Sequence, residues 1–224
     1  MVKIITIDGP SGAGKGTISR MLAKSLRFHY LDSGALYRLL GLVAIRHKIK
    51  VSDKVSLVRL AENMDISFHA MANGQNKVLL EAEDVTNELR TEQTAALASQ
   101  VAESVEVRKA LLVRQQEFAK DPGLVADGRD MGTGVFPDAQ LKVYLTASIE
   151  ERARRRYKQL LERGESVRLR ALEEQVRLRD ERDMSREASP LMRAADAVEL
   201  DTSELSIQEV LDTVQNIAVL RGFR

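Results

Sequence analysis

The first strand-like segment runs directly into a glycine-rich loop, and this junction constrains the fold more than any other feature of the chain. The apolar run at residues 3–7 and Asp8 precede the loop, and a helix is predicted to begin near Lys15. Glycines let the backbone curl so that successive N–H groups face one anion, and the helix N-terminus adds partial positive charge. A lysine in this position can reach the β- and γ-phosphates of a nucleotide. The predicted nucleoside triphosphate site comprises Gly9, Pro10, Ser11, Gly12, Ala13, Gly14, Lys15, Gly16 and Thr17.

The residue after Lys15 departs from the usual form of such loops. A Ser or Thr normally follows the lysine and places its hydroxyl on Mg²⁺, whereas this chain has Gly16 there and a hydroxyl one residue later, at Thr17. Coordination of Mg²⁺ by Thr17 is therefore left open. The alternative, a glycine-rich turn without a ligand, is disfavoured because strand, loop and helix come in the required order.

Five short apolar runs are separated by helical patterns along the chain. They cover residues 3–7, 29–31, 123–126, 141–145 and 197–200. Runs that do not alternate with polar residues favour buried strands of a parallel sheet covered on both faces. Ligands of such α/β sheets bind beyond the carboxyl ends of the strands. Four runs are followed by an acid at that end: Asp8, Asp32, Asp127 and Asp201. We therefore predict an α/β fold with its site at this edge of the sheet.

Two regions interrupt the alternation of strands and helices. Residues 66–85 read as a β-hairpin with a turn at 73–76, and the helical pattern of residues 91–103 follows it, so this region looks like an insertion into the core. Residues 150–187 form a highly charged helical stretch that is rich in arginine. We see no internal repeat and no low-complexity linker.

The composition excludes several classes of protein. With 224 residues and a formal net charge of +1, we expect one domain over residues 1–224. The chain has no cysteine, which excludes disulfide scaffolds, thiolate catalysis and Cys-ligated metals. Its longest apolar run, residues 39–45, is far shorter than the about 20 residues that span a bilayer. The N-terminal run is too short for a targeting signal. We expect a cytoplasmic monomer that does not bind membranes.

The charged residues favour transfer of a phosphoryl group to another phosphate. The Asn-Lys-x-Asp guanine reader of a Ras-like GTPase is missing, because Asn76-Lys77 is followed by Val-Leu. A kinase that acts on a hydroxyl needs a general base. A nucleotide kinase needs only positioning and positive charge, since its acceptor phosphate is already an anion. Arginine supplies that charge with a planar, bidentate fork, and arginines stand at 38, 108, 129 and throughout 152–186.

Two clusters of acids and arginines point to a binding site. Asp127-Gly-Arg-Asp130 lies just past the third predicted strand, and such a run after a buried strand is rarely mere packing. Arg179, Asp183 and Arg186 are spaced to share one face of a helix. The alternative for this second cluster is a solvated, self-neutralising helix face.

Two functions of other classes were weighed against a nucleotide kinase. An RNA-binding module is disfavoured because residues 150–187 hold 12 lysines and arginines against 10 acidic residues, and Tyr157 is their only aromatic residue. We therefore expect no nucleic-acid partner. A non-catalytic nucleotide switch stays open at this point, and turnover with an acceptor would separate it from a kinase.

Several longer motifs resemble the bacterial cytidylate kinases, which are P-loop nucleoside monophosphate kinases. The resemblance covers essentially the whole chain. Of the motifs given next in chain order, the second and third are the most specific to this family. The motifs are Ile7-Asp-Gly-Pro-Ser-Gly-Ala-Gly-Lys-Gly-Thr17, Leu31-Asp-Ser-Gly-Ala-Leu-Tyr-Arg38, Ala126-Asp-Gly-Arg-Asp-Met-Gly-Thr133, Val135-Phe-Pro-Asp-Ala139, and Arg179–Leu191 with its Ser-Pro-Leu end.

The resemblance implies an activity and an architecture. The activity is transfer of the γ-phosphoryl group of ATP to CMP or dCMP, with Mg²⁺, to give ADP and CDP or dCDP. The architecture is a five-stranded parallel sheet in the order 2-3-1-4-5. An inserted monophosphate-binding region spans residues 33–101 and contains the hairpin, and the arginine-rich lid spans residues 151–170. The nearest alternative is a kinase for another monophosphate, such as UMP, dTMP or AMP.

The resemblance also assigns residues to the two nucleotides. The ATP phosphates fall to Gly9–Thr17, with Lys15 in a catalytic role. The resemblance gives the cytosine base to Ser33, Ser99, Arg108 and Asp130, the acceptor phosphate to Arg38 and Arg129, and the sugar and its phosphate to Arg179, Asp183 and Arg186. An acid with Arg and Ser suits cytosine, which shows an N4 donor beside N3 and O2 acceptors.

Two further assignments are our own inference. We expect Arg155 and Arg156 of the lid, with Arg129, to neutralise charge in the transition state. We expect Asp127 to hold Mg²⁺ through water. The alternative for the lid arginines is a solvated helix face.

Overall fold

The computed structural model describes residues 2–70 and 76–224 and divides the chain into two compact units. The first unit consists of Met1–Leu31 and Ala119–Arg224, and the second is Asp32–Phe118. The predicted insertion, residues 33–101, falls within the second unit. That residues 1–224 act as one domain, with an insertion at 33–101 and a lid at 151–170, stays a prediction.

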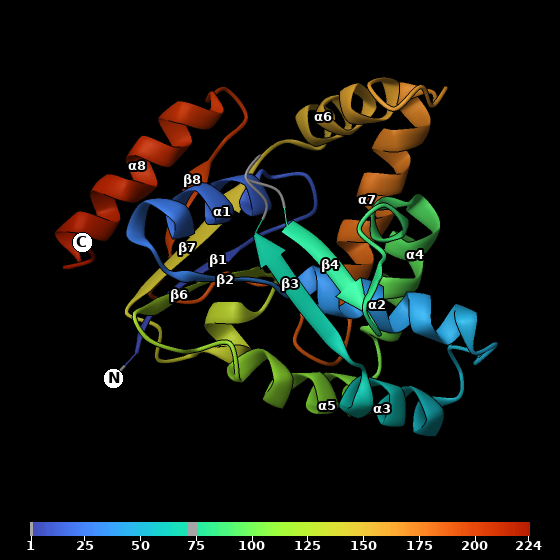
Figure 1. The fold of residues 1–224 in the computed structure, drawn as a ribbon. Coiled ribbons are helices and arrows are strands. Elements are labelled where there is room, and N and C mark those ends of the chain that lie inside the picture. The colour runs from blue at the N-terminus through green and yellow to red at the C-terminus, as the bar shows by residue number, and fades with distance from the viewer. Residues whose placement is uncertain (1, 71–75) are drawn as a thin grey trace. The chain divides into compact units, whose positions relative to one another are not determined.

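A five-stranded sheet in the order β2-β6-β1-β7-β8 confirms the predicted α/β fold and its 2-3-1-4-5 strand order (Figure 1). The strands are β1 (Lys3–Asp8), β2 (His29–Asp32), β6 (Gly123–Gly128), β7 (Leu141–Thr146) and β8 (Val198–Asp201). β1 pairs in parallel with β6, from Lys3 opposite Gly123 to Asp8 opposite Gly128. It also pairs in parallel with β7. The carboxyl ends of these three strands therefore meet at one edge of the sheet.

The helices of the first unit form two groups. α1 (Lys15–Leu26) and α8 (Ile207–Leu220) belong to the core around the central strands, whereas α6 (Ile149–Leu161) and α7 (Leu169–Ser185) pack against each other. The short π-helical turn η2 (Met131–Val135) follows β6. α1 and α8 contact each other and share one apolar core with β1 and β7 (Figure 1). Ile18 and Leu22 of α1 are buried in that core. Residues 9–14 connect β1 to α1 directly, as the sequence predicts.

The second unit holds the predicted hairpin among helices. Its elements are α2 (Ser33–Arg46), α3 (Lys54–Asn63), β3 (Ile66–Ala70), β4 (Asn76–Leu80), β5 (Glu83–Asp84), η1 (Glu88–Arg90), α4 (Glu92–Val101) and α5 (Val105–Gln116). β3 and β4 are antiparallel, which confirms the hairpin strands. The predicted turn at 73–76 lies, except for Asn76, outside the described residues. The sequence analysis did not predict β5, because it is only two charged residues long.

Two predicted boundaries differ from the structure. The charged stretch 150–187 forms two helices, α6 and α7, rather than one continuous pattern, and Gly164 between them has a φ of 77° that helical residues do not adopt. Asp127 lies inside β6 instead of just past it. Its side chain is therefore fixed by the strand rather than by a loop.

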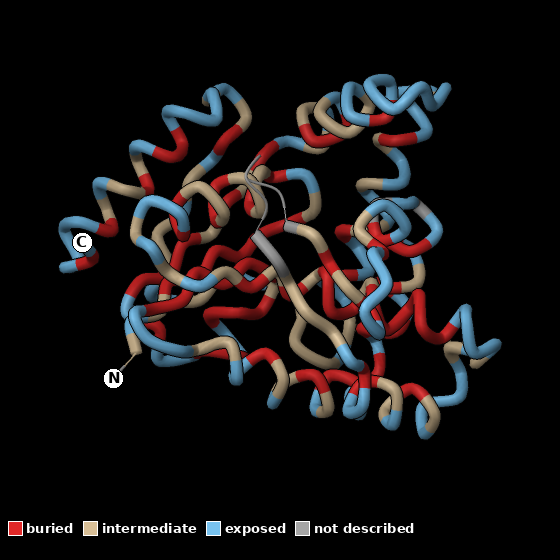
Figure 2. The backbone as a smooth tube through the Cα atoms, in the orientation of Figure 1, coloured by how far each residue is buried: buried red, intermediate tan, exposed pale blue. Residues whose placement is uncertain are grey.

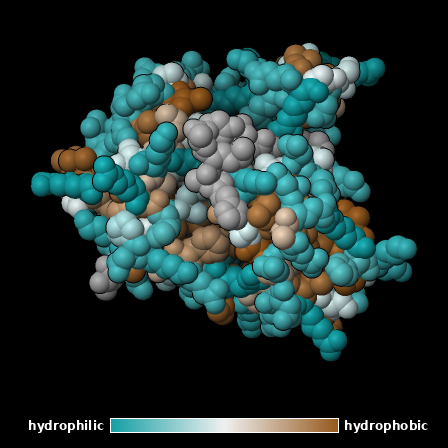
Figure 3. All heavy atoms as spheres, in the orientation of Figure 1, coloured by the Kyte–Doolittle hydropathy of each residue, from teal (hydrophilic) through white to brown (hydrophobic). Residues whose placement is uncertain are grey.

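Burial follows the strands of the sheet and the inner faces of the helices (Figure 2). Ile5, Ile7 and Leu145 are fully buried. The face of the molecule in Figure 3 is mostly hydrophilic, with exposed apolar side chains in small groups. Among the described residues, no helix combines the length and apolar character needed to cross a membrane.

We predict that Leu145→Ala lowers the free energy of unfolding by about 2–5 kcal/mol, because it removes a fully buried side chain from β7 and leaves a cavity. Urea denaturation followed by circular dichroism measures this loss. Leu220→Ala is the matched control, since Leu220 is 85% exposed and its truncation should change stability by less than about 0.5 kcal/mol. Equal effects of the two substitutions would contradict the assigned core.

Candidate functional site

The loop after β1 has a backbone that requires glycine. Gly9 has a φ of 144°, and a Cβ atom there would lie 1.9 Å from the carbonyl oxygen of Leu145. Gly12 and Gly14 also have positive φ, and Gly14 is the N-cap of α1. The loop therefore closes tightly onto the start of the helix, in the form that presents N–H groups to an anion.

The carbonyl groups of this loop accept hydrogen bonds from side chains. Lys15 Nζ donates to the carbonyl oxygen of Pro10 at 2.8 Å. Arg152 Nη1 donates to that of Ser11 at 3.1 Å, and Thr202 Oγ1 to that of Ala13 at 3.3 Å. These side chains therefore fix the loop through its carbonyl groups, and the contacts do not use its N–H groups.

Lys15 is buried, and its environment makes its ammonium group easy to deprotonate. Burial lowers the pKa of Lys15 to about 8, and the positive charge of Arg129 adds to the effect. The carboxylates of Asp127 and Asp8 act in the opposite direction. A phosphate group beside Lys15 would favour the charged form in the same way as these carboxylates.

Asp8, at the end of β1, fastens the turn that follows β6. Its Oδ1 accepts from the backbone N–H of Met131 at 2.8 Å, and its Oδ2 from that of Gly132 at 2.7 Å. Burial raises the pKa of Asp8 to about 6, although both N–H groups oppose the rise. The carboxylate thus fixes the position of the residues next to Arg129 and Asp130.

Asp127 lies beside the loop at the position of Gly16. A Cβ atom on Gly16 would lie 3.2 Å from Asp127 Oδ2, so a larger residue would crowd the carboxylate. Tyr30 Oη donates to the same oxygen at 3.0 Å. Within residues 2–70 and 76–224, no cluster of three or more acidic or histidine side chains could hold a metal ion. A single carboxylate beside the loop is compatible with Mg²⁺, which takes most of its ligands from substrate phosphates and water.

The predicted acceptor residues of the first unit form one charged cluster. Arg129 Nε donates a hydrogen bond to Asp183 Oδ2 of α7. Arg186 Nη1 lies 3.9 Å from the other oxygen of Asp183. Burial raises the pKa of Asp183, but the charges of the neighbouring arginines outweigh it and hold the pKa below the usual value of an aspartate. Asp130 is buried at the start of η2, next to Arg129.

The predicted lid arginines contact protein groups in this structure. Arg155 Nη2 donates to the carbonyl oxygen of Thr202 at 2.5 Å, and its Nε to Glu151 at 3.1 Å. Arg156 Nη1 donates to Gln159 at 3.4 Å. Their contact with a transferred phosphoryl group stays a prediction.

The predicted base-reading residues of the second unit are buried polar side chains. Ser33 Oγ donates to Gln115 Oε1 at 2.8 Å. The guanidinium of Arg108 lies 5.4 Å from the centre of the Tyr37 ring, and its Nη1 donates to the carbonyl oxygen of Ala102. Ser99 is also buried, whereas Arg38 is half-buried on α2. Buried polar groups of this kind suit recognition of a small polar ligand.

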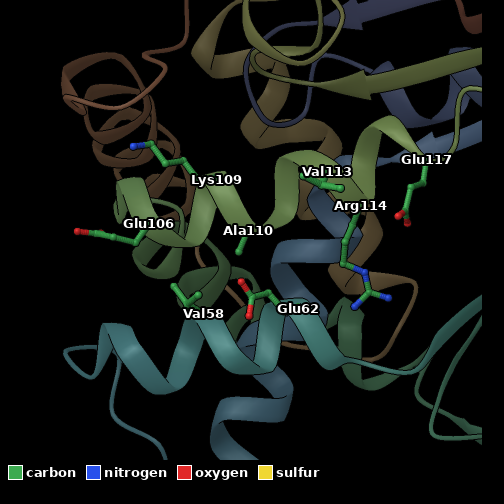
Figure 4. Close-up of a pocket in the computed structure, with 8 residues that line it drawn as sticks. All are labelled: Val58, Glu62, Glu106, Lys109, Ala110, Val113, Arg114 and Glu117. Carbon is green, nitrogen blue, oxygen red and sulfur yellow. The ribbon is translucent and has the colours of Figure 1, made fainter.

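A pocket of about 640 Å³ in the second unit lies between α3 and α5 (Figure 4). Its lining residues are Val58, Glu62, Glu106, Lys109, Ala110, Val113, Arg114 and Glu117. None of them is a predicted site residue. Arg114 Nη1 donates a hydrogen bond to the carbonyl oxygen of Ala61 at 3.0 Å. We assign no function to this pocket.

The structure adds residues that the sequence analysis did not single out. Arg152 and Thr202 support the loop, Tyr30 contacts Asp127, and Gln115 contacts Ser33. Only Gln115 carried a sequence signal, because it stands two helical turns after Arg108 and so shares its face of α5. The contacts of the other three join segments that are distant in the chain.

Comparisons with known proteins give one consistent family. The family model for cytidylate kinase matches residues 5–219. A cytidylate kinase of Pseudomonas savastanoi pv. phaseolicola is 53% identical over 220 residues, which cover 98% of this chain and 96% of the relative. One of Stutzerimonas stutzeri is 55% identical over 214 residues, covering 95% of this chain and 93% of the relative.

Solved structures share the fold. A gluconokinase from Sinorhizobium meliloti aligns with a TM-score of 0.51 over 98% of this chain and 93% of the other chain, at 12% identity. This likeness concerns the fold alone.

We predict that the affinity for ATP weakens above pH 8, because the free protein then loses the proton of Lys15, whose pKa is about 8. The dissociation constant should rise by up to about tenfold per pH unit until the pKa of Lys15 in the complex is reached. Isothermal titration calorimetry from pH 7 to pH 9.5 measures it. Lys15→Arg stays charged and is the control that should flatten the profile. A flat profile in the unsubstituted protein would contradict the assigned role of Lys15.

Proposed function

The chain belongs to the cytidylate kinase family, and from this premise we propose that it transfers the γ-phosphoryl group of ATP to CMP or dCMP. The products are ADP and CDP or dCDP, so the reaction serves pyrimidine nucleotide metabolism. The observation that carries the proposal is the pairing of β1 with β6, which brings the glycine loop and the Asp127–Asp130 segment to one edge of the sheet. A donor loop and a charged segment at one edge are what phosphoryl transfer between nucleotides needs.

We propose that ATP binds with its phosphates in the loop Gly9–Thr17. The backbone N–H groups cradle the phosphates, and the ammonium group of Lys15 turns from the carbonyl oxygen of Pro10 to the β- and γ-phosphates. Mg²⁺ bound to ATP would be held by Thr17 and, through water, by Asp127, and the metal would neutralise charge on the phosphates. The position of Asp127 beside Gly16 supports this assignment.

We propose that CMP is bound by the remaining predicted residues. Ser33, Ser99, Arg108 and Asp130 recognise the cytosine, Arg38 and Arg129 bind the acceptor phosphate, and Arg179, Asp183 and Arg186 bind the sugar and its phosphate. Burial of Ser33, Arg108 and Asp130 supports a role in recognition, since buried polar groups reject ligands that leave them unpaired.

The chemistry requires positioning and charge rather than proton abstraction. The acceptor phosphate of CMP is already an anion, so no general base is needed. Lys15 and Arg129 lie in the same unit as the loop and oppose the repulsion between donor and acceptor phosphates. We propose that Arg155 and Arg156 of the lid add charge stabilisation when the substrates are bound.

We also propose that the enzyme acts as a cytoplasmic monomer on these small molecules, without a nucleic-acid or membrane partner. The formal net charge of +1 supports the absence of a nucleic-acid or anionic-membrane partner, because a strongly basic surface is the usual basis of such binding.

The test of the substrate is ADP production from ATP and Mg²⁺ with CMP, dCMP, UMP, dTMP, AMP or GMP as acceptor. We expect strong selectivity for CMP and dCMP. Selectivity for another monophosphate would leave the phosphoryl-transfer chemistry in place and overturn the base assignment. Absence of turnover with every acceptor would overturn the enzyme assignment and favour a non-catalytic nucleotide switch.

We predict that Asp130→Ala lowers kcat/KM for CMP by about ten- to a hundredfold, because it removes a charged hydrogen-bond acceptor that is worth about 1.5–3 kcal/mol. The KM for ATP should change by less than about threefold. Steady-state kinetics with each substrate varied in turn measures both. Asp138→Ala, at an exposed aspartate after the same turn, is the control. An equal loss for CMP and ATP would show that Asp130 does not read the base.

A further inference from the structure

Arg152 of α6 is buried and makes hydrogen bonds with every nitrogen of its guanidinium group. Only 3% of the surface of Arg152 is exposed to solvent. Nε donates to the carbonyl oxygen of Ala147 at 2.9 Å, and Nη1 to that of Ser11 at 3.1 Å. Nη1 and Nη2 also donate to the two carboxylate oxygens of Asp180 at 3.0 and 2.5 Å. One side chain therefore joins the phosphate loop, the end of β7 and α7.

The contact of Arg152 with the loop is both polar and steric. The carbonyl oxygen of Ser11 lies within the loop that presents its N–H groups to phosphate, so it needs a donor from the protein. A Cβ atom on Gly12 would lie 3.0 Å from Cβ of Arg152. The base of the Arg152 side chain thus packs against Gly12, while its head holds Ser11.

Asp180 holds Arg152 in this place from α7. The carboxylate is 10% exposed and takes both Nη groups in a bidentate ion pair, which fixes the plane of the guanidinium. Asp180 directly follows Arg179 and stands three residues before Asp183, and both of these are proposed acceptor residues. α7 therefore carries residues of two kinds. Arg179 and Asp183 are proposed to bind the acceptor, and Asp180 orients Arg152, which in turn supports the donor loop.

The pair is not needed merely to join α6 to α7. Ala153, Leu160 and Leu172 already pack the two helices together in an apolar cluster. A buried ion pair contributes little net stability compared with an apolar pair of similar volume, since desolvation opposes the attraction of the charges. Because Arg152 also donates to the carbonyl oxygen of Ser11, the ion pair supports the loop as well as the interface between the two helices.

We propose that Arg152 and Asp180 are positioning residues of the donor site, which hold the phosphate loop from its outer side and couple its geometry to α7. The proposal rests on the proposed function for the identity of the donor, ATP. Its specific consequence is that a change on the acceptor helix, at Asp180, weakens the binding of ATP in the absence of any acceptor.

Asp180→Asn tests this consequence because it keeps the shape of the side chain and removes its charge. We expect the dissociation constant of ATP, measured by isothermal titration calorimetry without CMP, to rise by about tenfold or more. Arg177→Gln and Glu181→Gln are matched controls, since both residues lie on the exposed face of α7 and pair with each other. These controls should bind ATP within about twofold of the unsubstituted protein.

A second variant separates loop support from stability. Arg152→Met with Asp180→Leu replaces the ion pair with apolar side chains of similar volume, which often leaves stability unchanged or improves it. We expect a protein that still unfolds cooperatively but binds ATP at least tenfold more weakly, because the carbonyl oxygen of Ser11 has lost its donor. ATP affinity within twofold of the original in this folded double variant would overturn the proposal.

If a variant is destabilised, hydrogen exchange measured by mass spectrometry distinguishes local loosening of the loop from a global loss of stability. In Asp180→Asn we expect faster exchange in the peptide covering residues 9–17 and unchanged exchange in the peptide of α8. Equal acceleration in both peptides would show a global loss of stability and overturn the proposal. The readouts are independent of the acceptor, so a protein that binds ATP but fails to phosphorylate CMP would refute the proposed function while still deciding this inference.

Discussion

A phosphate site built from backbone N–H groups depends on what happens to the carbonyl groups of the same peptides. They point away from the ligand, into the protein, and each needs a donor there. In this chain the donors are the side chains of Lys15 on α1, of Arg152 and Arg155 on α6, and of Thr202 directly after β8. The loop is therefore held by elements that lie up to 189 residues further along the chain. Its shape belongs to the whole of the first unit rather than to the local glycine pattern.

The parallel sheet makes that dependence possible. Because β6, β1 and β7 are neighbours with the same direction, their carboxyl ends bring the loop, Asp127 and the start of α6 to one edge. Asp8 then fixes the turn after β6 with both of its carboxylate oxygens. Arg129, beside that turn, reaches Asp183 of α7. A short series of polar contacts thus runs from the edge that carries the proposed donor loop to the residues proposed for the acceptor.

The sequence predicted the parts of the fold that depend on local pattern. The apolar run Lys3–Ile7 and the glycines that follow it were enough to place β1, the loop and the start of α1 at Lys15. The strand order came from the family resemblance. The contacts of Arg152 could not be predicted, because an arginine in a charged helix looks the same whether it faces solvent or a buried carbonyl group. Arg154, two residues away, is exposed and pairs with Glu151. Which arginine of the run is buried is decided by tertiary packing, and periodicity alone does not contain that information.

The order of the segments along the chain has a consequence for how the protein is made. The second unit is one continuous segment, Asp32–Phe118, whereas the strands that flank β1 begin at Gly123 and Leu141. During synthesis the helices of the second unit can fold while β1 and the loop still have no partner strands. β1 and the loop therefore acquire their binding geometry late, after the whole of the second unit has been made. Non-local parallel pairing of this kind is slow to form. The apolar β1 strand therefore stays exposed while its partner strands are made, and this is the stage at which a chaperone would protect it most.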